Sequence, residues 1–416
     1  MRSNAVIVVL LTSLVAASYG FGIYLFAQLV PDMQATLGFD FSYVGAITAS
    51  GQFGFLISAV LAAWLTPKVG GGLMILGSGI ICAIALLLVP LSSNILVIGA
   101  LLTVLAGTAA TVFVPMVDVI SRVVDYRFRG MAMGLVSSGT SYGVFVNSLL
   151  VPIYSPRGEW RTVWLLVGII SLFIALVVYR KFRDAGLFRR EQLSTDSLKA
   201  DSVALSSVQL FSRGSELMQP WVLTIWSMNF LIGFSTFPFQ NYLSSYLRTE
   251  LGFGVEYTAQ IWATIGLVGM FAGLAVGWLS DKAGLRTAML LVYVCVVLAA
   301  LIFVVYPHGH WPLVAGVLFA TAFYPIFGLI PAYVSKLATS TATAVAIFGI
   351  ANVMQGTGGM LGNYGAGLLA SHSGTFSEVY ALIGVVGVIL MVLTARLPSA
   401  SRTAASAPCL LPESVD

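Results

Sequence analysis

The chain has 416 residues, of which 58% are hydrophobic and 9% are charged, and its mean hydropathy is +0.96. A soluble protein typically carries about 25% charged residues. This composition therefore excludes a water-facing surface over most of the chain and predicts that lipid is the main solvent.

Bilayer-crossing helices can be predicted along the whole chain, because each needs about 20 mainly apolar residues. The first apolar segment, from Val6 to Val30, is too long for the core of a signal peptide and is followed by no small-x-small cleavage site. We therefore expect it to be retained as a span. The sequence predicts an all-α membrane protein of twelve transmembrane helices, which begin near Val6, Phe41, Leu73, Ile95, Met131, Val163, Pro220, Tyr257, Thr287, Trp311, Ala342 and Val379.

The basic residues are unevenly divided between the two sides of these spans. If the N-terminus is inside, the inner loops hold 17 of the 20 Lys and Arg residues, and the outer loops hold Arg157, Arg161 and Arg248. Basic residues collect in the cytoplasmic loops of membrane proteins. We therefore expect a multi-pass protein of the inner (plasma) membrane with both termini in the cytoplasm.

The longest connection separates the sixth and seventh spans and contains the polar run RREQLSTDSLKADS. This composition is typical of a flexible linker. We predict an N-terminal six-helix bundle over residues 1–181, a cytoplasmic linker over 182–218, a C-terminal six-helix bundle over 219–397 and a disordered cytoplasmic tail over 398–416.

The two predicted halves repeat each other at a constant spacing. LGFDFSYVGAI begins at Leu37, and LGFGVEYTAQI begins at Leu251. WLTPKVGGG begins at Trp64, and WLSDKAGLR begins at Trp278, which is the same offset along the chain. Two matches at one offset indicate homologous halves, and in transporters built this way the solute site lies near the midplane between the repeats.

The loop after the eighth span carries a more specific pattern. GWLSDKAGLR, from Gly277 to Arg286, resembles the G-x-L-x-D-K/R-x-G-R-K/R signature of the major facilitator superfamily. In the first repeat the corresponding loop has Pro67 in place of the Asp and Gly72 in place of the Arg. The resemblance implies a transporter that works by alternating access, with charged residues at a cytoplasmic gate; the candidates are Asp118, Arg122, Asp281, Lys282 and Arg286.

A narrower similarity lies in the first span. YGFGIYLFAQLVPDM is similar to the G-x-G-R-F-A opening of a bacterial subgroup of poorly characterised permeases. This chain has Ile23 where that subgroup places Arg. An anion contact made by that Arg cannot be expected here.

Substrate contacts are expected from uncharged polar and aromatic residues, because every ionisable residue can be placed in a loop or near a helix end. Tyr24 and Gln28 share one face of the first span. The seventh span offers a second face, and the eleventh adds two amides. An unpaired amide is costly in lipid, although a neighbouring helix can pair it as well as a solute can. The substrate-binding candidates are Tyr24, Gln28, Trp226, Asn229, Phe237, Gln240, Asn352 and Gln355.

Other chemistry is weakly represented. Cys82, Cys295 and Cys409 lie apart, and the histidines His308 and His310 fall in an exposed turn, so neither a disulfide framework nor a metal site is expected. Asp118 and Arg122 have i, i+4 spacing and can pair on one helix face. A structural pair at the gate is favoured there over a proton site. We expect facilitated diffusion or exchange, with proton coupling possible only through Asp118.

The leading interpretation is a secondary active or facilitative transporter of a neutral, amphipathic or monocarboxylate-like organic solute. A drug or toxic-compound efflux carrier is the alternative within transport. A membrane enzyme would need a catalytic set at membrane depth, and a sensor would need an output domain; both are disfavoured. No Walker motif occurs, which argues against ATP-driven pumping. The expected partners are a small-molecule substrate and the lipid bilayer, without nucleic acid or cofactor, and we expect a monomer.

Overall fold

The computed structural model describes residues 2–125, 128–188, 217–338 and 340–398, and this part of the chain is almost entirely helical. The predicted linker and tail lie mostly outside these residues. In the first half the helices are α1 (Arg2–Val15), the π-helix η1 (Ala16–Tyr24), α2 (Leu25–Leu37), α3 (Phe41–Val69), α4 (Gly71–Leu88), η2 (Val89–Leu91), α5 (Ile95–Phe113), α6 (Met116–Val123), α7 (Arg129–Ser137), α8 (Gly139–Tyr154), η4 (Ser155–Arg157) and α9 (Trp160–Asp184). In the second half they are α13 (Pro220–Asn241), α14 (Leu243–Ser245), η5 (Tyr246–Glu250), α15 (Val255–Ala283), α16 (Leu285–Val305), α17 (Trp311–Leu337), α18 (Thr341–Ser373) and α19 (Ser377–Arg396).

The membrane-spanning segments agree with the predicted ones. Within the described residues, eleven helical segments are long and apolar enough to cross a bilayer. The predicted fifth span is formed by α7 and α8 together, which are separated at Ser138. Ser and Gly neighbours are a common cause of helix breaks, and here Ser137, Ser138 and Gly139 stand in a row. The fold is therefore an all-α membrane architecture with the fifth span divided into two pieces.

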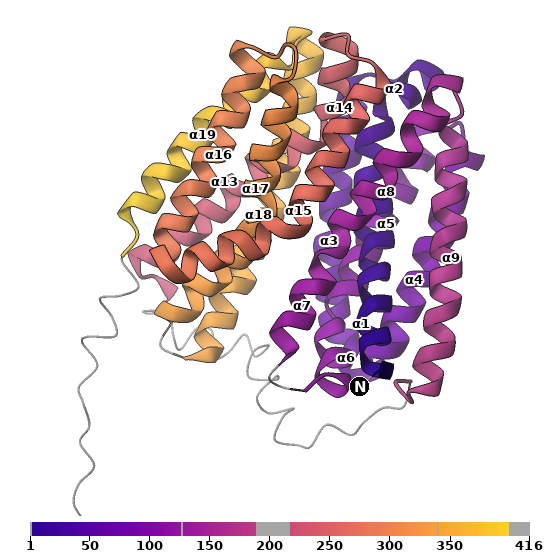
Figure 1. The fold of residues 1–416 in the computed structure, drawn as a ribbon, viewed down its shortest axis with the longest axis vertical. Coiled ribbons are helices and arrows are strands. Elements are labelled where there is room, and N and C mark those ends of the chain that lie inside the picture. Colours follow the sequence, from indigo (N-terminus) through magenta and orange to yellow (C-terminus); the bar gives the residue numbers. More distant parts are fainter. Residues whose placement is uncertain (1, 126–127, 189–216, 339, 399–416) are drawn as a thin grey trace, which may run out of the picture.

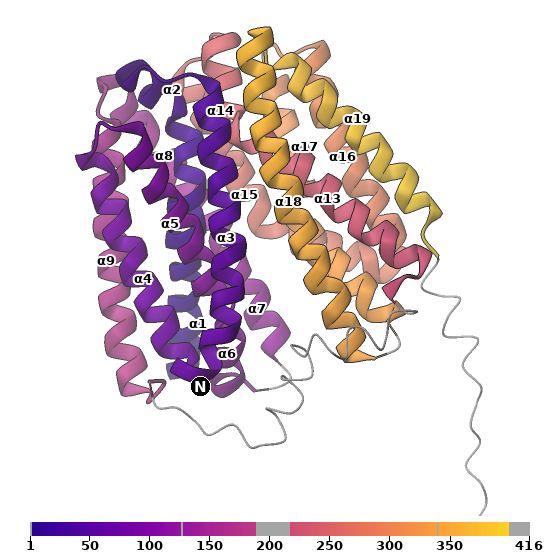
Figure 2. The same ribbon diagram turned by 180° about the vertical axis from the view of Figure 1, so that it is seen from behind.

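The helices form two bundles that follow the order of the chain. Figures 1 and 2 show the first bundle in indigo to magenta and the second in rose to yellow, side by side. Helix α3 of the first bundle packs along α18 of the second, and α8 packs along α15. We call the plane of contact between the bundles the seam. We call the side that carries Arg2 the N-terminal side and the opposite side the far side.

The seam is closed at the far side. The bundles meet there and diverge toward the N-terminal side (Figures 1 and 2). The rings of Phe41 and Phe376, one from each bundle, lie edge to face at 4.7 Å between centroids. A Cβ atom on Gly45 of α3 would lie only 3.2 Å from the Cα atom of Gly367 on α18. The two backbones can approach this closely because neither residue has a side chain.

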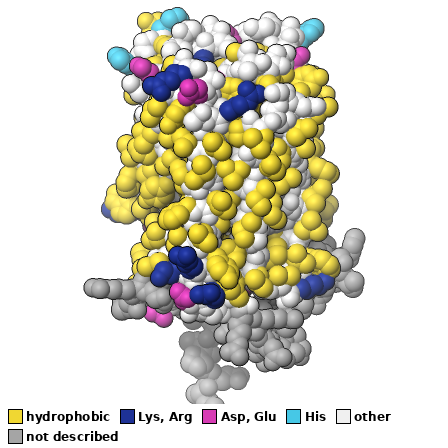
Figure 3. Space-filling model, turned by 90° about the vertical axis from the view of Figure 1, so that its right-hand side faces the viewer, with side chains coloured by type: hydrophobic (Ala, Val, Ile, Leu, Met, Phe, Trp, Pro, Cys, Tyr) yellow, Lys and Arg dark blue, Asp and Glu magenta, His cyan; other side chains and the backbone are white. Residues whose placement is uncertain are grey.

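The outer surface is that of a membrane protein, and equivalent turns in the two halves have the same backbone conformation. In Figure 3 a wide band of hydrophobic side chains separates charged groups near the two ends of the molecule. The turns that follow α3 and α15 place Gly70 and Gly284 at φ values of 96° and 87°. These glycines are separated by the repeat offset, and only glycine adopts this backbone region without strain. The two halves of the chain therefore turn in the same way at equivalent places.

Candidate solute pathway between the two bundles

The helix of the first span has a wider turn than an α-helix at the place where it crosses the fifth span. Its middle is the π-helix η1, a form that occurs often at functional sites. A Cβ atom on Gly20 would lie 2.4 Å from the Cα atom of Gly143 in α8, so η1 and α8 are in backbone contact. The amide nitrogen of Asn147 donates a 2.7 Å hydrogen bond to the carbonyl oxygen of Gly20. This bond fixes the widened turn to α8.

Three aromatic side chains connect the two bundles beside this turn. The Tyr24 ring, at the end of η1, meets the Phe323 ring of α17 edge to face, with centroids 6.5 Å apart. The Phe237 ring of α13 meets the same Phe323 ring at 6.4 Å. The candidates Tyr24 and Phe237 are thus brought together through Phe323. We call Tyr24, Phe237 and Phe323 the aromatic cluster.

Two buried amides have unused hydrogen-bonding groups. The Nε2 atom of Gln28 is 3.5 Å from the carbonyl oxygen of Val144, and its Oε1 atom has no partner among the described residues. The Gln240 side chain is 1% exposed, and neither of its amide atoms has a partner there. Buried polar atoms are normally paired, and each exception calls for an explanation. Gln28 and Gln240 therefore have groups available for a ligand.

The other two candidates on α13 make hydrogen bonds inside the second bundle. The Nδ2 atom of Asn229 donates to the carbonyl oxygen of Ile225 in its own helix at 2.8 Å. The indole nitrogen of Trp226 donates to the carbonyl oxygen of Ile347 in α18 at 3.0 Å. Trp226 thus connects α13 to α18, whereas the amide nitrogen of Asn229 is paired within α13.

The two candidates on α18 differ in burial. Asn352 is exposed, whereas Gln355 is 6% exposed. A Cβ atom on Gly233 of α13 would lie 1.9 Å from the carbonyl oxygen of Gln355, and one on Gly359 would lie 2.2 Å from the Phe237 ring. Glycines at both positions let α13 and α18 cross closely and leave room for that ring.

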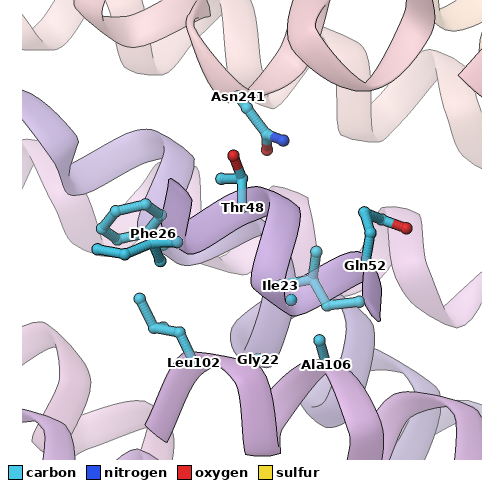
Figure 4. A pocket seen from close by; sticks show the side chains of 10 residues that line it. Gly22, Ile23, Phe26, Thr48, Gln52, Leu102, Ala106 and Asn241 are labelled. Atoms are coloured by element: carbon cyan, nitrogen blue, oxygen red, sulfur yellow. The ribbon is translucent and has the colours of Figure 1, made fainter. Parts of the chain in front are cut away.

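A small pocket lies where α3 and α5 pack against the first span, with Asn241 of α13 also lining it (Figure 4). Its volume is about 30 Å³, roughly the share of one water molecule in the liquid. Drug-sized ligands occupy pockets of about 300–1,000 Å³, so this pocket is too small for one in the present conformation. It is lined by Gly22, Ile23, Phe26, Ile47, Thr48, Gly51, Gln52, Leu102, Ala106 and Asn241. Ile23, which replaces the Arg of the permease subgroup, makes part of the wall apolar.

An ion pair crosses the seam at the far side. Arg248 of η5 binds both carboxylate oxygens of Asp32 in α2, with nitrogen–oxygen distances of 2.5 and 2.7 Å. The Ser155 hydroxyl also donates to Asp32, at 2.6 Å. The Asp32 and Arg248 side chains are 8% and 15% exposed. This far-side pair locks α2 of the first bundle to η5 of the second.

Neither this pair nor Phe323 was predicted from the sequence. The interval along the chain between Asp32 and Arg248 is close to the repeat offset, so the two residues occupy near-equivalent places in the two halves. Opposite charges at near-equivalent positions were the available signal. Phe323 had none, because one Phe among 25 in an apolar chain is not distinctive.

On the N-terminal side, Asp118 and Arg122 form the pair that their spacing predicts. The nitrogen–oxygen distance is 3.0 Å. Asp118 also accepts a 3.1 Å hydrogen bond from the backbone nitrogen of Gly71, the first residue of α4. A carboxylate is favourable at a helix N-terminus. Asp118 thus connects α6 to the start of α4 within the first bundle.

The charges of the second loop signature also contact their own bundle. Arg286 donates a hydrogen bond to the carbonyl oxygen of Ala395 at the end of α19. The Lys282 ammonium lies 4.0 Å from the centre of the Trp278 ring, and Asp281 is exposed. In this conformation, Arg286 and Lys282 thus make these contacts inside the second bundle rather than across the seam.

Comparisons with known proteins agree with this architecture. A putative metabolite transport protein of Haemophilus influenzae is 24% identical over 273 residues, which cover 64% of this chain and 65% of that protein. A probable sulfoacetate transporter of Cupriavidus necator is 22% identical over 270 residues, or 62% of this chain and 61% of that protein. Both matches span less than two thirds of the relative.

A solved structure and a family model cover more of the chain. The structure is that of a bacterial homolog of the human lysosomal transporter Spinster, in an inward-facing and occupied conformation. It superimposes with a TM-score of 0.76 at 15% identity and covers 97% of this chain and 98% of that one. The model of the Major Facilitator Superfamily matches residues 12–353. Because this match covers more than half of the sequence, the chain belongs to the Major Facilitator Superfamily.

Proposed function

We propose that this protein is a secondary carrier that moves a small organic solute through the seam by alternating access. The observation that carries the proposal is the pair of buried, incompletely bonded amides, Gln28 and Gln240, next to the aromatic cluster. Leaving such groups unpaired costs about 1–3 kcal/mol each. A solute with one or two polar groups and a ring or short apolar body would satisfy the amides and pack on the rings.

The distribution of basic residues supports placing the N-terminal side in the cytoplasm and the far side outside. In that orientation this conformation is closed to the outside, and the bundles diverge toward the inside. Transport then requires the far side to open while the N-terminal side closes, as one bundle rocks against the other. The gate at the N-terminal side would be formed by the charged residues that lie there, which are Asp118, Arg122, Asp281, Lys282 and Arg286.

The named relatives support a transported metabolite or small organic anion, and the family makes a membrane enzyme a poor alternative. Export of toxic compounds would use the same seam in the opposite direction. We further propose a monomer in the inner membrane, with facilitated diffusion or exchange as the mode of transport. A panel of radiolabelled organic acids and their uncharged amides, tested for uptake into proteoliposomes, checks for a carrier. No uptake and no exchange of any member would contradict it.

The amides themselves can be tested once a transported solute is found. We expect Gln240→Ala to raise the apparent KM about 5- to 150-fold, because one hydrogen-bonding partner contributes about 1–3 kcal/mol. Asn229→Ala is the matched control, since its amide nitrogen donates to its own helix. Equal KM values for Gln240→Ala and wild type, at equal protein abundance, would place the solute elsewhere.

A further inference from the structure

We propose that Arg248 binds the carboxylate of an organic anion when the far side is open, and that Asp32 replaces this carboxylate when the far side closes. This inference deepens the proposed carrier function by naming the chemical class of the solute and the residue that recognises it. It rests on the far-side pair and on what remains of that pair when the bundles separate.

The pair shows that the Arg248 guanidinium accommodates a carboxylate. Two nitrogens of Arg248 reach the two oxygens of Asp32 at 2.5 and 2.7 Å, which is a two-pronged contact. Guanidinium and carboxylate groups match in this geometry, and the resulting bonds are short and strong. A carboxylate on a solute would have the same shape and charge as the Asp32 side chain that occupies the position now.

Opening the far side affects the two partners unequally. Asp32 and Ser155 both belong to the first bundle, so their 2.6 Å hydrogen bond can persist when the seam opens. Arg248 belongs to the second bundle, and both of its hydrogen bonds to described residues go to Asp32. An arginine cannot lose its charge in a protein. In the open state, therefore, Asp32 keeps a hydrogen-bonding partner, whereas the charged guanidinium of Arg248 has lost its carboxylate and can bind another anion.

Neighbouring charges do not take over this role. Glu250, two residues further along η5, already accepts hydrogen bonds from the Thr375 hydroxyl at 2.6 Å and from the backbone nitrogen of Phe376 at 2.5 Å. Arg161, another basic residue of the far side, donates to Ser93 of the first bundle at 2.9 Å. Of these groups, Arg248 is the cation that reaches the seam.

The position of Arg248 joins this contact to the proposed pathway. Tyr24, Gln28 and Asp32 follow each other at intervals of four residues, so they share one face of the first span. Four helical residues advance about 6 Å along the axis. The carboxylate position is thus about one turn closer to the far side than the amide of Gln28. An acid of the size of a single ring plus a carboxylate can reach from one to the other.

This arrangement predicts that the binding of an anion is linked to the opening of the far side. In the closed state Asp32 occupies Arg248, so an anion can bind only after the seam has opened. A ligand that binds one of two conformations shifts the population toward it. At a concentration ten times its dissociation constant, such an anion raises the ratio of open to closed molecules about tenfold.

A cysteine at position 245 can report this opening. Ser245 is fully buried and lies three residues before Arg248, at the end of α14, which packs against α2 of the other bundle. Cysteine is close in size to serine. The test uses Ser245→Cys in full-length protein in which Cys82, Cys295 and Cys409 have been replaced. The rate of labelling by an impermeant maleimide is measured on intact cells, with benzoate as the anionic probe and benzamide as its uncharged counterpart.

We expect benzoate to raise the labelling rate up to about tenfold and benzamide to leave it unchanged. Asp32→Asn should label faster without a ligand and still respond to benzoate, because the competing carboxylate is gone but Arg248 remains. Arg248→Gln should also label faster but no longer respond, whereas Arg248→Lys should recover part of the response. Ser155→Ala keeps both charges and should still respond to benzoate.

Three results would overturn the assignment. They are a response to benzoate that survives in Arg248→Gln, an equal response to benzamide, and no response in either the wild type or Asp32→Asn. A purely structural pair would give faster labelling in both charge variants without any effect of benzoate. The carrier function is judged separately. If Arg248→Gln takes up organic acids as fast as the wild type, the protein is a carrier but Arg248 does not recognise the solute. If benzoate changes the labelling rate but no solute is transported, Arg248 binds anions but the carrier function is rejected.

Discussion

At the scale of single residues, amides on similar spans have very different roles. Asn147 donates to the carbonyl oxygen of Gly20 inside η1, Asn229 donates to its own helix, and Gln240 has no partner among the described residues. The sequence places all three in spans. It does not give the rotation of each helix or its neighbours, and these decide which amide is paired by the protein and which is available to a solute.

The bond from Asn147 leads to a prediction about stability. In Asn147→Leu the carbonyl oxygen of Gly20 loses this donor, and we expect the free energy of unfolding to fall by about 1–3 kcal/mol. The purified protein in detergent should have a lower thermal midpoint. Asn352→Leu, which changes an exposed amide, serves as the control. Equal midpoints for the two variants would show that Asn147 does not stabilise η1.

At the scale of helices, sequence reasoning works best where the pattern is local. The predicted span starts lie within a few residues of the observed helix starts, because apolar length and turn glycines are written into short stretches. The break between α7 and α8 was not predicted, although Ser137, Ser138 and Gly139 stand in sequence there. The contacts of α3 with α18 depend on glycines from different halves of the chain, so no single stretch of sequence indicates them.

The glycine contact between α3 and α18 can be tested directly. A Cβ atom on Gly367 would lie 2.6 Å from the carbonyl oxygen of Phe41 and 2.9 Å from the Cα atom of Gly45. Inserting a methyl group into a tight contact costs about 1–3 kcal/mol. The Cβ atom would also lie 2.6 Å from the Tyr242 hydroxyl of its own bundle. The contacts with Phe41 and Gly45 exist only while the far side is closed, so we expect Gly367→Ala to favour the open form about 5- to 150-fold.

The readout for Gly367→Ala is the maleimide labelling rate of the cysteine at position 245. Gly365→Ala is the matched control, since a Cβ atom there would meet nothing within 4 Å. The same rate in both variants would mean that the seam adjusts to the methyl group without opening.

At the scale of the whole molecule, the orientation in the membrane remains a prediction. We expect a single cysteine at His308, between α16 and α17, to react with impermeant maleimide in intact cells. One at Lys336, near the end of α17, should react only after the membrane is permeabilised. Both positions are exposed, so access across the membrane decides the result. The opposite pattern would reverse the assignment of the two sides and of every gate described above.

The sequence predicted the helical class and the resemblance to the superfamily, but not the conformation. In alternating access the same helices form both closed states, because one bundle rocks against the other. The sequence predicts a gate at the N-terminal side, formed by Asp118, Arg122, Asp281, Lys282 and Arg286, and that gate stays a prediction because this conformation is closed at the far side. The far side is closed in part by the Asp32–Arg248 pair, which the sequence did not indicate because its two residues come from distant segments.

The length of the α3–α18 contact has a consequence for the electric field across the membrane. At one end of this contact Gly45 of α3 lies beside Gly367 of α18, and at the other end Leu56 of α3 lies beside Gly356 of α18. On α3 this stretch, from Gly45 to Leu56, is about 16 Å of helix. The hydrocarbon core of a bilayer is about 30 Å thick. If water fills the space where the bundles diverge, the membrane potential falls mainly across this sealed half of the thickness. The Asp32–Arg248 pair has no net charge, so the field exerts little net force on it. The work done by the voltage is then set by the charge of the solute that crosses this layer.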